Sequence, residues 1–189
     1  MLWRSVNRGK DDMRDNMRAI VVMGVSGCGK TTVATAVCER MGATLIEGDA
    51  FHPEQNVAKM RSGMPLTDAD RQGWLERLGR ELANALAVHE TAALACSALK
   101  RSYRDMLRAT VPGLGFVYLE LSRDAAASRV SQRAGHYMPA SLVDSQFRDL
   151  EPPVGEPRVL TVHATNALSA NVDDVETWWR EIASASTNG

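Results

Sequence analysis

The sequence predicts an α/β fold in which a parallel sheet is covered by helices on both faces. Short apolar runs with the composition of strands alternate with longer amphipathic segments with the composition of helices. The chain has 189 residues, of which 44% are hydrophobic, and this is enough for one well-buried domain. A glycine-rich loop joins the first apolar run to the first helical segment. These three observations favour a single α/β domain.

The expected strands are short and regularly spaced. In chain order they cover residues 19–23, 44–47, 91–96, 116–121 and 159–163. The expected helices fill the intervals, at residues 32–41, 53–61, 69–88, 100–109, 123–133 and 172–182. Strands that alternate with helices form a parallel sheet, here of five strands, and ligands of such sheets bind outside the carboxyl ends of the strands.

Two segments interrupt the alternation. Residues 63–66 form a turn, and residues 134–157 contain glycine, proline and charges without a strand of their own. A loop this long in a compact domain is usually functional, so we expect a lid inserted at about residues 125–157 of one domain over residues 19–185. Residues 1–18 are charged and lack an apolar stretch, which predicts a disordered tail, with Met17 a candidate natural start.

The glycine-rich loop is a phosphate-binding loop. Residues 24–31 read G-V-S-G-C-G-K-T, which matches G-x-x-x-x-G-K-[ST] between a strand and a helix, the context that the motif requires. We expect Lys30 to reach the β- and γ-phosphates of ATP and the Thr31 hydroxyl to bind Mg²⁺. The fold class is then the three-layer α/β/α sandwich of the P-loop NTPases with a small helical lid. The expected ATP-binding residues are Gly24, Val25, Ser26, Gly27, Cys28, Gly29, Lys30, Thr31 and Thr32.

A second group of candidate residues follows the second strand, in the sequence G-D-A-F-H-P. Asp49 is placed to accept a proton from a hydroxyl that attacks the γ-phosphate, or else to cap the helix that starts at Pro53. His52 could bind the substrate or hold the turn.

Basic residues follow the third strand, which ends near Ser97. Lys100 and Arg104 are four residues apart on one helical face, so they could meet an anionic substrate together or form an ordinary solvated face. Arg71 is open to the same two interpretations.

Two further arginines, Arg129 and Arg133, stand at i and i+4 near the expected lid, followed by His136. Arginines so placed could clamp the transferring phosphate, or they could belong to a solvated face.

Composition narrows the class of substrate. The net charge is −1 with acids and bases interspersed, so the chain has no long-range attraction for nucleic acid or an anionic membrane, and its substrates are expected to be small. No segment approaches the ~20 apolar residues of a membrane span. Cys28, Cys38 and Cys96 show neither paired nor metal-type spacing, which favours a soluble protein of the reducing cytoplasm.

These motifs together resemble those of the gluconokinases, P-loop kinases that phosphorylate D-gluconate at the 6-hydroxyl. The resemblance covers the chain from Ala19 to the last helix. It is carried by M-G-V-S-G-C-G-K-T, G-D-A-F-H-P-E-Q-N-V-A-K-M, S-G-M-P-L-T-D-A-D-R-Q-G-W-L and C-S-A-L-K-R-S-Y-R-D-M-L-R, and it continues through F-V-Y-L-E-L, S-R-V-S-Q-R-A-G-H-Y-M and S-Q-F-R-D-L-E-P-P.

The resemblance implies a role for each candidate. Asp49 would orient or deprotonate the gluconate hydroxyl, with His52, Ser97 and His136 expected near the substrate. Arg71, Lys100 and Arg104 would form the cationic side of the sugar-acid pocket, and Arg129 and Arg133 would be the lid arginines. Mg²⁺ would be held by Thr31 and waters, and residues 163–167 would lie near adenine. A homodimer is also implied.

Other functions stay open at this point. A kinase of another acidic small molecule, such as shikimate, or a nucleoside monophosphate kinase would share the fold and the loop, and only the motifs at Asp49–His52 and Cys96–Arg104 argue against them. A non-catalytic nucleotide-binding module is more remote. A regulatory GTPase would need N-K-x-D, which the chain lacks, and the charge balance disfavours a nucleic-acid kinase.

Overall fold

The computed structural model describes residues 17–132 and 140–185. These residues contain a five-stranded sheet in the order β2-β3-β1-β4-β5, and every neighbouring pair of strands is parallel. The predicted parallel sheet is therefore confirmed. The strands are Ala19–Met23 (β1), Thr44–Glu47 (β2), Ala92–Ala95 (β3), Gly115–Glu120 (β4) and Val159–His163 (β5).

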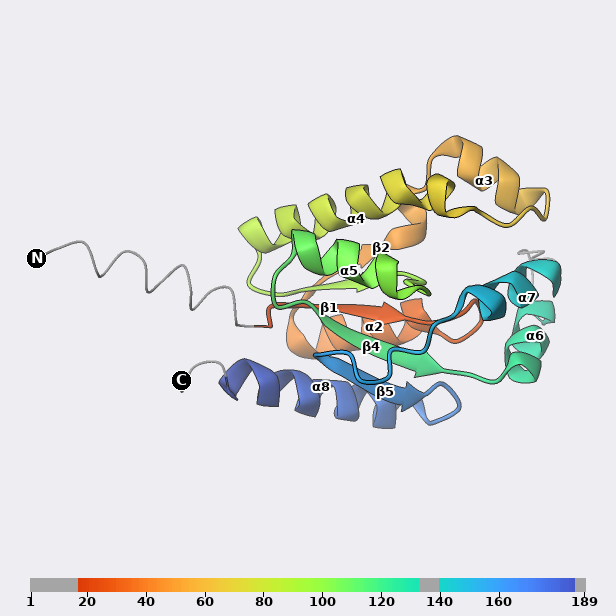
Figure 1. Cartoon of the computed structure of the whole chain (residues 1–189). Helices are drawn as coiled ribbons and strands as arrows, with labels where there is room; N and C mark the ends of the chain where they lie inside the picture. The colour runs from red at the N-terminus through yellow and green to blue at the C-terminus, as the bar shows by residue number, and fades with distance from the viewer. Residues whose placement is uncertain (1–16, 133–139, 186–189) are drawn as a thin grey trace, which may run out of the picture.

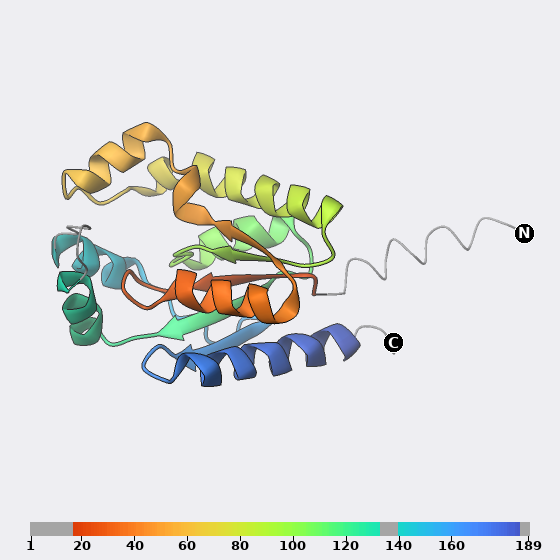
Figure 2. The same cartoon turned by 180° about the vertical axis from the view of Figure 1, so that it is seen from behind.

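Helices cover both faces of this sheet, which gives the expected three layers. Helices α4 and α5 lie on one face, and α2 and α8 lie on the other (Figure 1, Figure 2). The described helices are Lys30–Met41 (α2), Glu54–Arg61 (α3), Asp68–Val88 (α4), Arg101–Thr110 (α5), Arg123–Ser131 (α6), Ala140–Asp149 (α7) and Leu168–Ala185 (α8), with a short 3₁₀ helix, η1, at Gly48–Phe51.

The central strand β1 explains the two hydrophobic cores. Successive side chains of a strand point to opposite faces, so Ile20 and Val22 pack with the α2 and α8 side, which includes Trp179. Val21 packs with the α4 and α5 side, which includes Trp74. A strand covered on both faces has no polar face, and this is why its sequence is a continuous apolar run.

Helix α7 lies within the segment expected to form a small helical lid, although the sequence analysis gave no bounds for a helix there. Leu142 and Val143 are buried and Phe147 packs partly against the core, so the helix has an apolar face. Pro139, just before it in the sequence, is a residue type that often begins helices. Helices α6 and α7 pack on each other beyond the carboxyl ends of the strands (Figure 1).

The domain begins slightly earlier than expected. Met17 is buried, and its carbonyl accepts a hydrogen bond from Trp179 Nε1 at 2.7 Å. The Arg18 guanidinium donates to the carbonyls of Leu86, His89 and Glu90. These two residues, which had been assigned to the tail, therefore belong to the folded domain.

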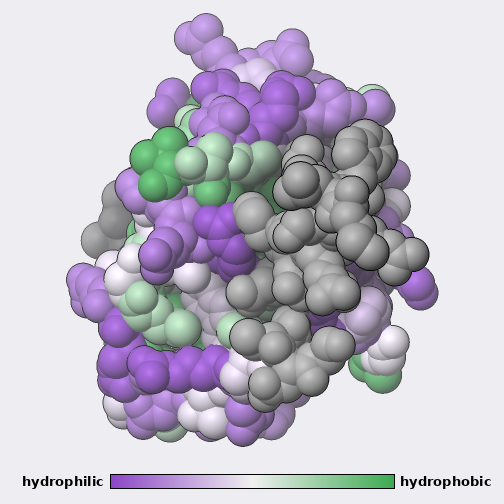
Figure 3. All heavy atoms as spheres, turned by 90° about the vertical axis from the view of Figure 1, so that its left-hand side faces the viewer, coloured by the Kyte–Doolittle hydropathy of each residue, from purple (hydrophilic) through white to green (hydrophobic). Residues whose placement is uncertain are grey.

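The end of the sheet where the strands begin is shown in Figure 3. The described residues visible there are mostly hydrophilic, with a few small hydrophobic areas among them. Within the described ranges, no helix combines the length and the apolar character needed to cross a membrane.

Candidate active site

The phosphate loop connects β1 to α2 in a conformation that depends on its glycines. Gly24 has φ +141°, and a Cβ at this position would lie 2.9 Å from both Cys28 Sγ and the Leu119 carbonyl oxygen. Gly29 has φ +94° and immediately precedes α2. The loop N–H groups thus meet at a helix N-terminus whose first turn carries no acidic residue, and this arrangement favours an anion.

The reactive groups of the loop lie at its surface, except for the thiol. Lys30 Nζ donates to the Val25 carbonyl at 3.2 Å, so the ammonium group bends back over the loop. Thr31 is exposed at the start of α2. Burial raises the pKa of the Cys28 thiol, although Lys30 acts against this shift, so the thiol is neutral near pH 7.

Asp49 lies in η1, directly after β2, at the carboxyl end of the sheet. Its side chain is 79% exposed, and its Oδ1 atom is 4.0 Å from His52 Nε2. The residue before α3 is Pro53, and this helix has no side-chain cap. Asp49 therefore does not act as the N-cap of α3, which was the alternative interpretation of its position.

His52 is held beside Asp49 by stacking on Trp74. The two rings are 4.0 Å apart with an interplanar angle of 16°, and Trp74 Nε1 donates to the Gly48 carbonyl at 2.9 Å. Burial lowers the pKa of His52, and the charge of Arg71 lowers it further, whereas Asp49 opposes the shift. The imidazole is therefore neutral near pH 7, and its Nδ1 atom is buried without a partner among the described residues.

Arg71 and Lys100 were equivalent candidates in the sequence, and the structure separates them. Arg71 is only 6% exposed, its Nε atom has no partner among the described residues, and its guanidinium lies 5.9 Å from the Tyr103 ring centroid. Lys100 Nζ lies 2.7 Å from Asp68 Oδ1 and 3.8 Å from Asp149 Oδ1. The hydrogen bond to Asp68 raises the pKa of Lys100. Lys100 is thus already paired with carboxylates.

Arg104 does not face the expected pocket, which corrects its predicted contact with the substrate. Its side chain is fully buried and paired with Glu156, and Nη1 donates to the carbonyls of Ala98 and Leu99 at 3.0 and 2.9 Å. Ala98 has φ +41°, an unfavourable value for a residue with a side chain. Arg104 therefore stabilises the turn between β3 and α5 instead of contacting a ligand.

Three charged residues lie near the end of β3. Burial raises the pKa of the Cys96 thiol to about 12, and Asp49, Lys30 and Arg71 all lie close enough to perturb this value. The next residue, Ser97, accepts a hydrogen bond from the Gly24 N–H through its carbonyl oxygen at 3.3 Å. A carboxylate, the loop lysine and a cation that has no carboxylate partner among the described residues therefore lie near the same strand end.

Arg129 of α6 bridges the loop and the segment that follows β5. Its Nη1 atom donates to the Gly27 carbonyl at 3.4 Å and its Nη2 atom to the Ala164 carbonyl at 2.9 Å. Arg133 and His136, the other candidates near the expected lid, lie outside the described residues.

Comparisons with known proteins agree on one family. Residues 20–153 match the family model described as the AAA domain. A gluconokinase of Gluconobacter oxydans is 49% identical over 145 residues, which cover 77% of this chain and 82% of that protein. The thermosensitive gluconokinase of Escherichia coli is 39% identical over 156 residues, which cover 82% of this chain and 83% of that protein. The chain belongs to the gluconokinase family.

Solved structures agree with this assignment. The crystal structure of a gluconokinase from Sinorhizobium meliloti has 45% sequence identity to this chain and a TM-score of 0.79. The superposed region covers 88% of this chain and 94% of the Sinorhizobium chain. An unliganded sugar kinase from Janibacter has 39% identity and a TM-score of 0.82, and covers 90% of this chain and 98% of its own. The gluconokinase resemblance inferred from the motifs is confirmed, as is the P-loop kinase fold.

Three residues of the candidate site were missed by the sequence analysis. Trp74 stacks on His52, and the Tyr103 hydroxyl donates to Asp68. Gln146 of α7 binds Ser26 in the phosphate loop. The helical periodicity that places Trp74 and Tyr103 on buried faces was available in the sequence, whereas nothing local indicated the contact of Gln146.

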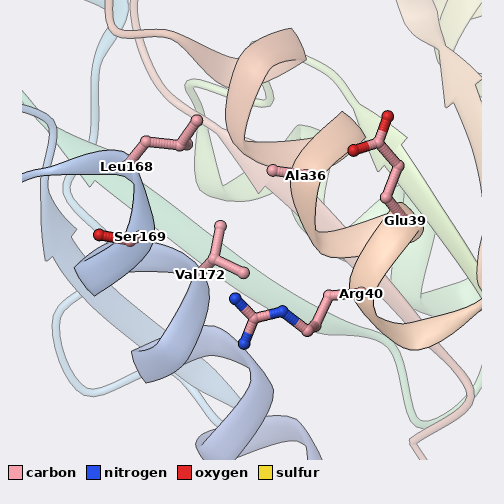
Figure 4. A pocket seen from close by; sticks show the side chains of 6 residues that line it. All are labelled: Ala36, Glu39, Arg40, Leu168, Ser169 and Val172. Carbon is pink, nitrogen blue, oxygen red and sulfur yellow. The ribbon is translucent and has the colours of Figure 1, made fainter.

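A separate hollow lies between α2 and α8, away from the phosphate loop (Figure 4). It is lined by Ala36, Glu39, Arg40, Leu168, Ser169 and Val172. Its single cation, Arg40, is already paired with Asp173 and Glu176. We therefore assign the active site to the loop side.

Proposed function

We propose that the protein transfers the γ-phosphoryl group of ATP to the 6-hydroxyl of D-gluconate, forming 6-phosphogluconate and ADP. The observation that carries this proposal is the placement of three residues at the carboxyl end of the sheet: Lys30 at the start of α2, the exposed Asp49 directly after β2, and the buried Arg71 beside the Tyr103 ring. These residues provide a phosphate-binding cation, an exposed carboxylate and a cation for an acidic substrate. The gluconokinase relatives support the same reaction.

The donor side fits a nucleoside triphosphate. The Gly24 position leaves no room for a side chain, and the free start of α2 offers N–H groups to the phosphates. Lys30 would turn from the Val25 carbonyl to the β- and γ-phosphates and stabilise the charge that develops on them. Mg²⁺ would be held by the Thr31 hydroxyl, phosphate oxygens and waters, and it would neutralise phosphate charge when bound.

The acceptor side fits a flexible hydroxy acid. Asp49 would take the proton of the 6-hydroxyl while the hydroxyl oxygen bonds to the γ-phosphorus and the bond from this phosphorus to the bridging oxygen of ADP breaks. Arg71 would bind the carboxylate of gluconate, because it lacks a carboxylate partner among the described residues. Neutral His52 would hydrogen-bond a sugar hydroxyl.

The decisive assay offers the purified protein Mg-ATP with a panel of acceptors, namely gluconate, other sugar acids, shikimate and nucleoside monophosphates. We expect gluconate to be the preferred acceptor. Preference for shikimate or a nucleoside monophosphate would replace this proposal with the corresponding kinase, and ATP binding without transfer to any acceptor would indicate a binding module.

The Lys30→Ala variant tests whether the activity belongs to this site. We expect it to abolish phosphoryl transfer, because a lysine at this loop position neutralises charge on the transferring phosphate. The measurement is 6-phosphogluconate formation at saturating ATP, and near-normal turnover in this variant would end the kinase proposal.

The assembly and location of the protein are also proposed. The family resemblance supports a homodimer, which light scattering of the purified protein would detect as twice the chain mass of 20.6 kDa. The balanced charge and the spacing of the cysteines support a cytoplasmic location.

A further inference from the structure

One contact of the phosphate loop has no role in the proposed function: Gln146 of α7 binds Ser26. The Ser26 N–H donates to Gln146 Oε1 at 2.6 Å, and Gln146 Nε2 lies 3.0 Å from Ser26 Oγ. A backbone N–H can only donate, so the carboxamide oxygen must face it, and this leaves Nε2 to donate to the hydroxyl. A carboxamide matches this donor and acceptor pair, and it joins two residues that are 120 positions apart.

Helix α7 makes two further contacts. In its middle, Asp144 forms an ion pair with Arg123 of α6 at 2.6 Å. At its end, Asp149 lies 3.8 Å from Lys100 Nζ, and Glu151 accepts a hydrogen bond from the Arg101 N–H at 2.6 Å. The C-terminal end of α7 is thus tied to the start of α5, on the acceptor side. Gln146 ties the middle of the helix to the phosphate loop, on the donor side.

Phosphoryl transfer requires that the donor side and the acceptor side of the site keep a fixed position relative to each other. The attacking oxygen must lie in line with the bond that breaks, and a displacement of about 1 Å can lower the rate by about 10². A contact that joins the phosphate loop to the acceptor side would limit how far the attacking oxygen can move from this line.

We propose that Gln146 is a positioning residue that aligns the acceptor side with the phosphate loop through Ser26. This proposal rests on the proposed function, because it assigns the residue a part in transfer to the acceptor. Gln146 acts through Ser26 and α7, and it does not exchange a proton with the substrate.

The test compares Gln146→Met, which keeps the length of the side chain but not its hydrogen bonds, with Arg148→Met at an exposed position of the same helix. We expect Gln146→Met to lower kcat for gluconate by about 10-fold to 100-fold. ATP hydrolysis without acceptor and the Kd of a Mg²⁺-bound, non-hydrolysable ATP analogue should stay within about 3-fold, because the loop itself is intact. Arg148→Met should match the wild type in all three measurements.

A double-mutant cycle tests the route through Ser26. Ser26→Ala removes the hydroxyl and keeps the N–H. If the two residues act as one unit, the double variant loses less activity than the product of the two single losses, whereas independent effects that simply multiply would contradict the proposal.

Two further outcomes would overturn it. One is an unchanged kcat in Gln146→Met; if the analogue also binds more tightly, Gln146 only blocks a phosphate donor. The other is a parallel loss of transfer, hydrolysis and melting temperature, which would indicate a packing role alone. If the wild type prefers another acceptor, the proposed function fails, and the same comparison with that acceptor still decides the role of Gln146.

Discussion

Single residues of the same type occupy different environments in this site. Arg71 and Arg104 are both buried arginines, but Arg104 is saturated by Glu156 and carbonyls, whereas Arg71 has an unpartnered Nε atom among the described residues. A buried guanidinium nitrogen without a hydrogen-bond partner is costly, so this arrangement favours an anionic ligand at Arg71. The difference between these arginines leads to separate predictions for function and stability.

The Asp49→Asn variant tests the proposed base. We expect turnover on gluconate to fall by about 10² or more, the usual scale for a general base, while ATP binding stays nearly unchanged. The measurement is kcat together with the Kd for ATP. Weaker ATP binding with normal turnover would instead assign Asp49 a structural role.

The Arg71→Ala and Lys100→Ala variants test which cation binds the carboxylate of gluconate. We expect Arg71→Ala to raise the KM for gluconate about 10-fold or more, the scale of a charge-assisted contact, and to weaken the preference for gluconate over neutral polyols. Lys100→Ala should have a smaller effect, because Lys100 is paired with Asp68. The KM for ATP serves as the internal control, and equal gluconate KM values in both variants and the wild type would place the carboxylate elsewhere.

At the scale of elements, the turn between β3 and α5 depends on the buried Arg104–Glu156 pair. Burial acts to raise the pKa of Glu156, but the hydrogen bonds and charges of Arg104 and Arg108 together outweigh it and lower this pKa. This ion pair connects the turn to the segment just before β5. The same turn contacts the phosphate loop, because the Ser97 carbonyl accepts a hydrogen bond from the Gly24 N–H. The pair therefore stabilises the site without touching a ligand.

The Arg104→Met variant tests this structural role. We expect the free energy of unfolding to fall by about 3–5 kcal/mol, because Glu156 keeps a buried charge without its main partner. Denaturant unfolding measures the change. The double variant Arg104→Met/Glu156→Gln should recover part of the loss, and a change in gluconate KM with unaltered stability would restore Arg104 to the substrate pocket.

At the scale of the whole molecule, the sequence predicted what depends on local patterns. The apolar run of residues 19–23 predicted the buried strand β1. The spacing of the glycines and Lys30 between Gly24 and Thr31 predicted the phosphate-binding loop. The helical lid was predicted, but the bounds of α7 were not, because this helix lies in a segment rich in turn residues. The roles of Arg104 and Gln146 could not be predicted, since their partners lie 52 and 120 residues away in the sequence.

The compact packing of the domain also predicts how slowly its cysteine thiols react. Cys28, Cys38 and Cys96 are all buried, and burial raises the pKa of Cys38 to about 11 and that of Cys96 to about 12. Because the thiolate is the reactive form, we expect all three to react with an alkylating reagent at pH 8 far more slowly than a free cysteine. Reaction in denaturant is the control, and one fast-reacting thiol in the native protein would contradict the prediction.

Because its three thiols are buried, we expect the unmodified chain to react only slowly with thiol-specific fluorescent dyes. Cysteines introduced at Gln55 on α3 and Ala127 on α6, both exposed, would take maleimide dyes selectively over the buried native thiols. The two helices flank the carboxyl ends of the strands (Figure 1). Single-molecule energy transfer between the dyes would then measure how the distance between α3 and α6 changes when each substrate binds.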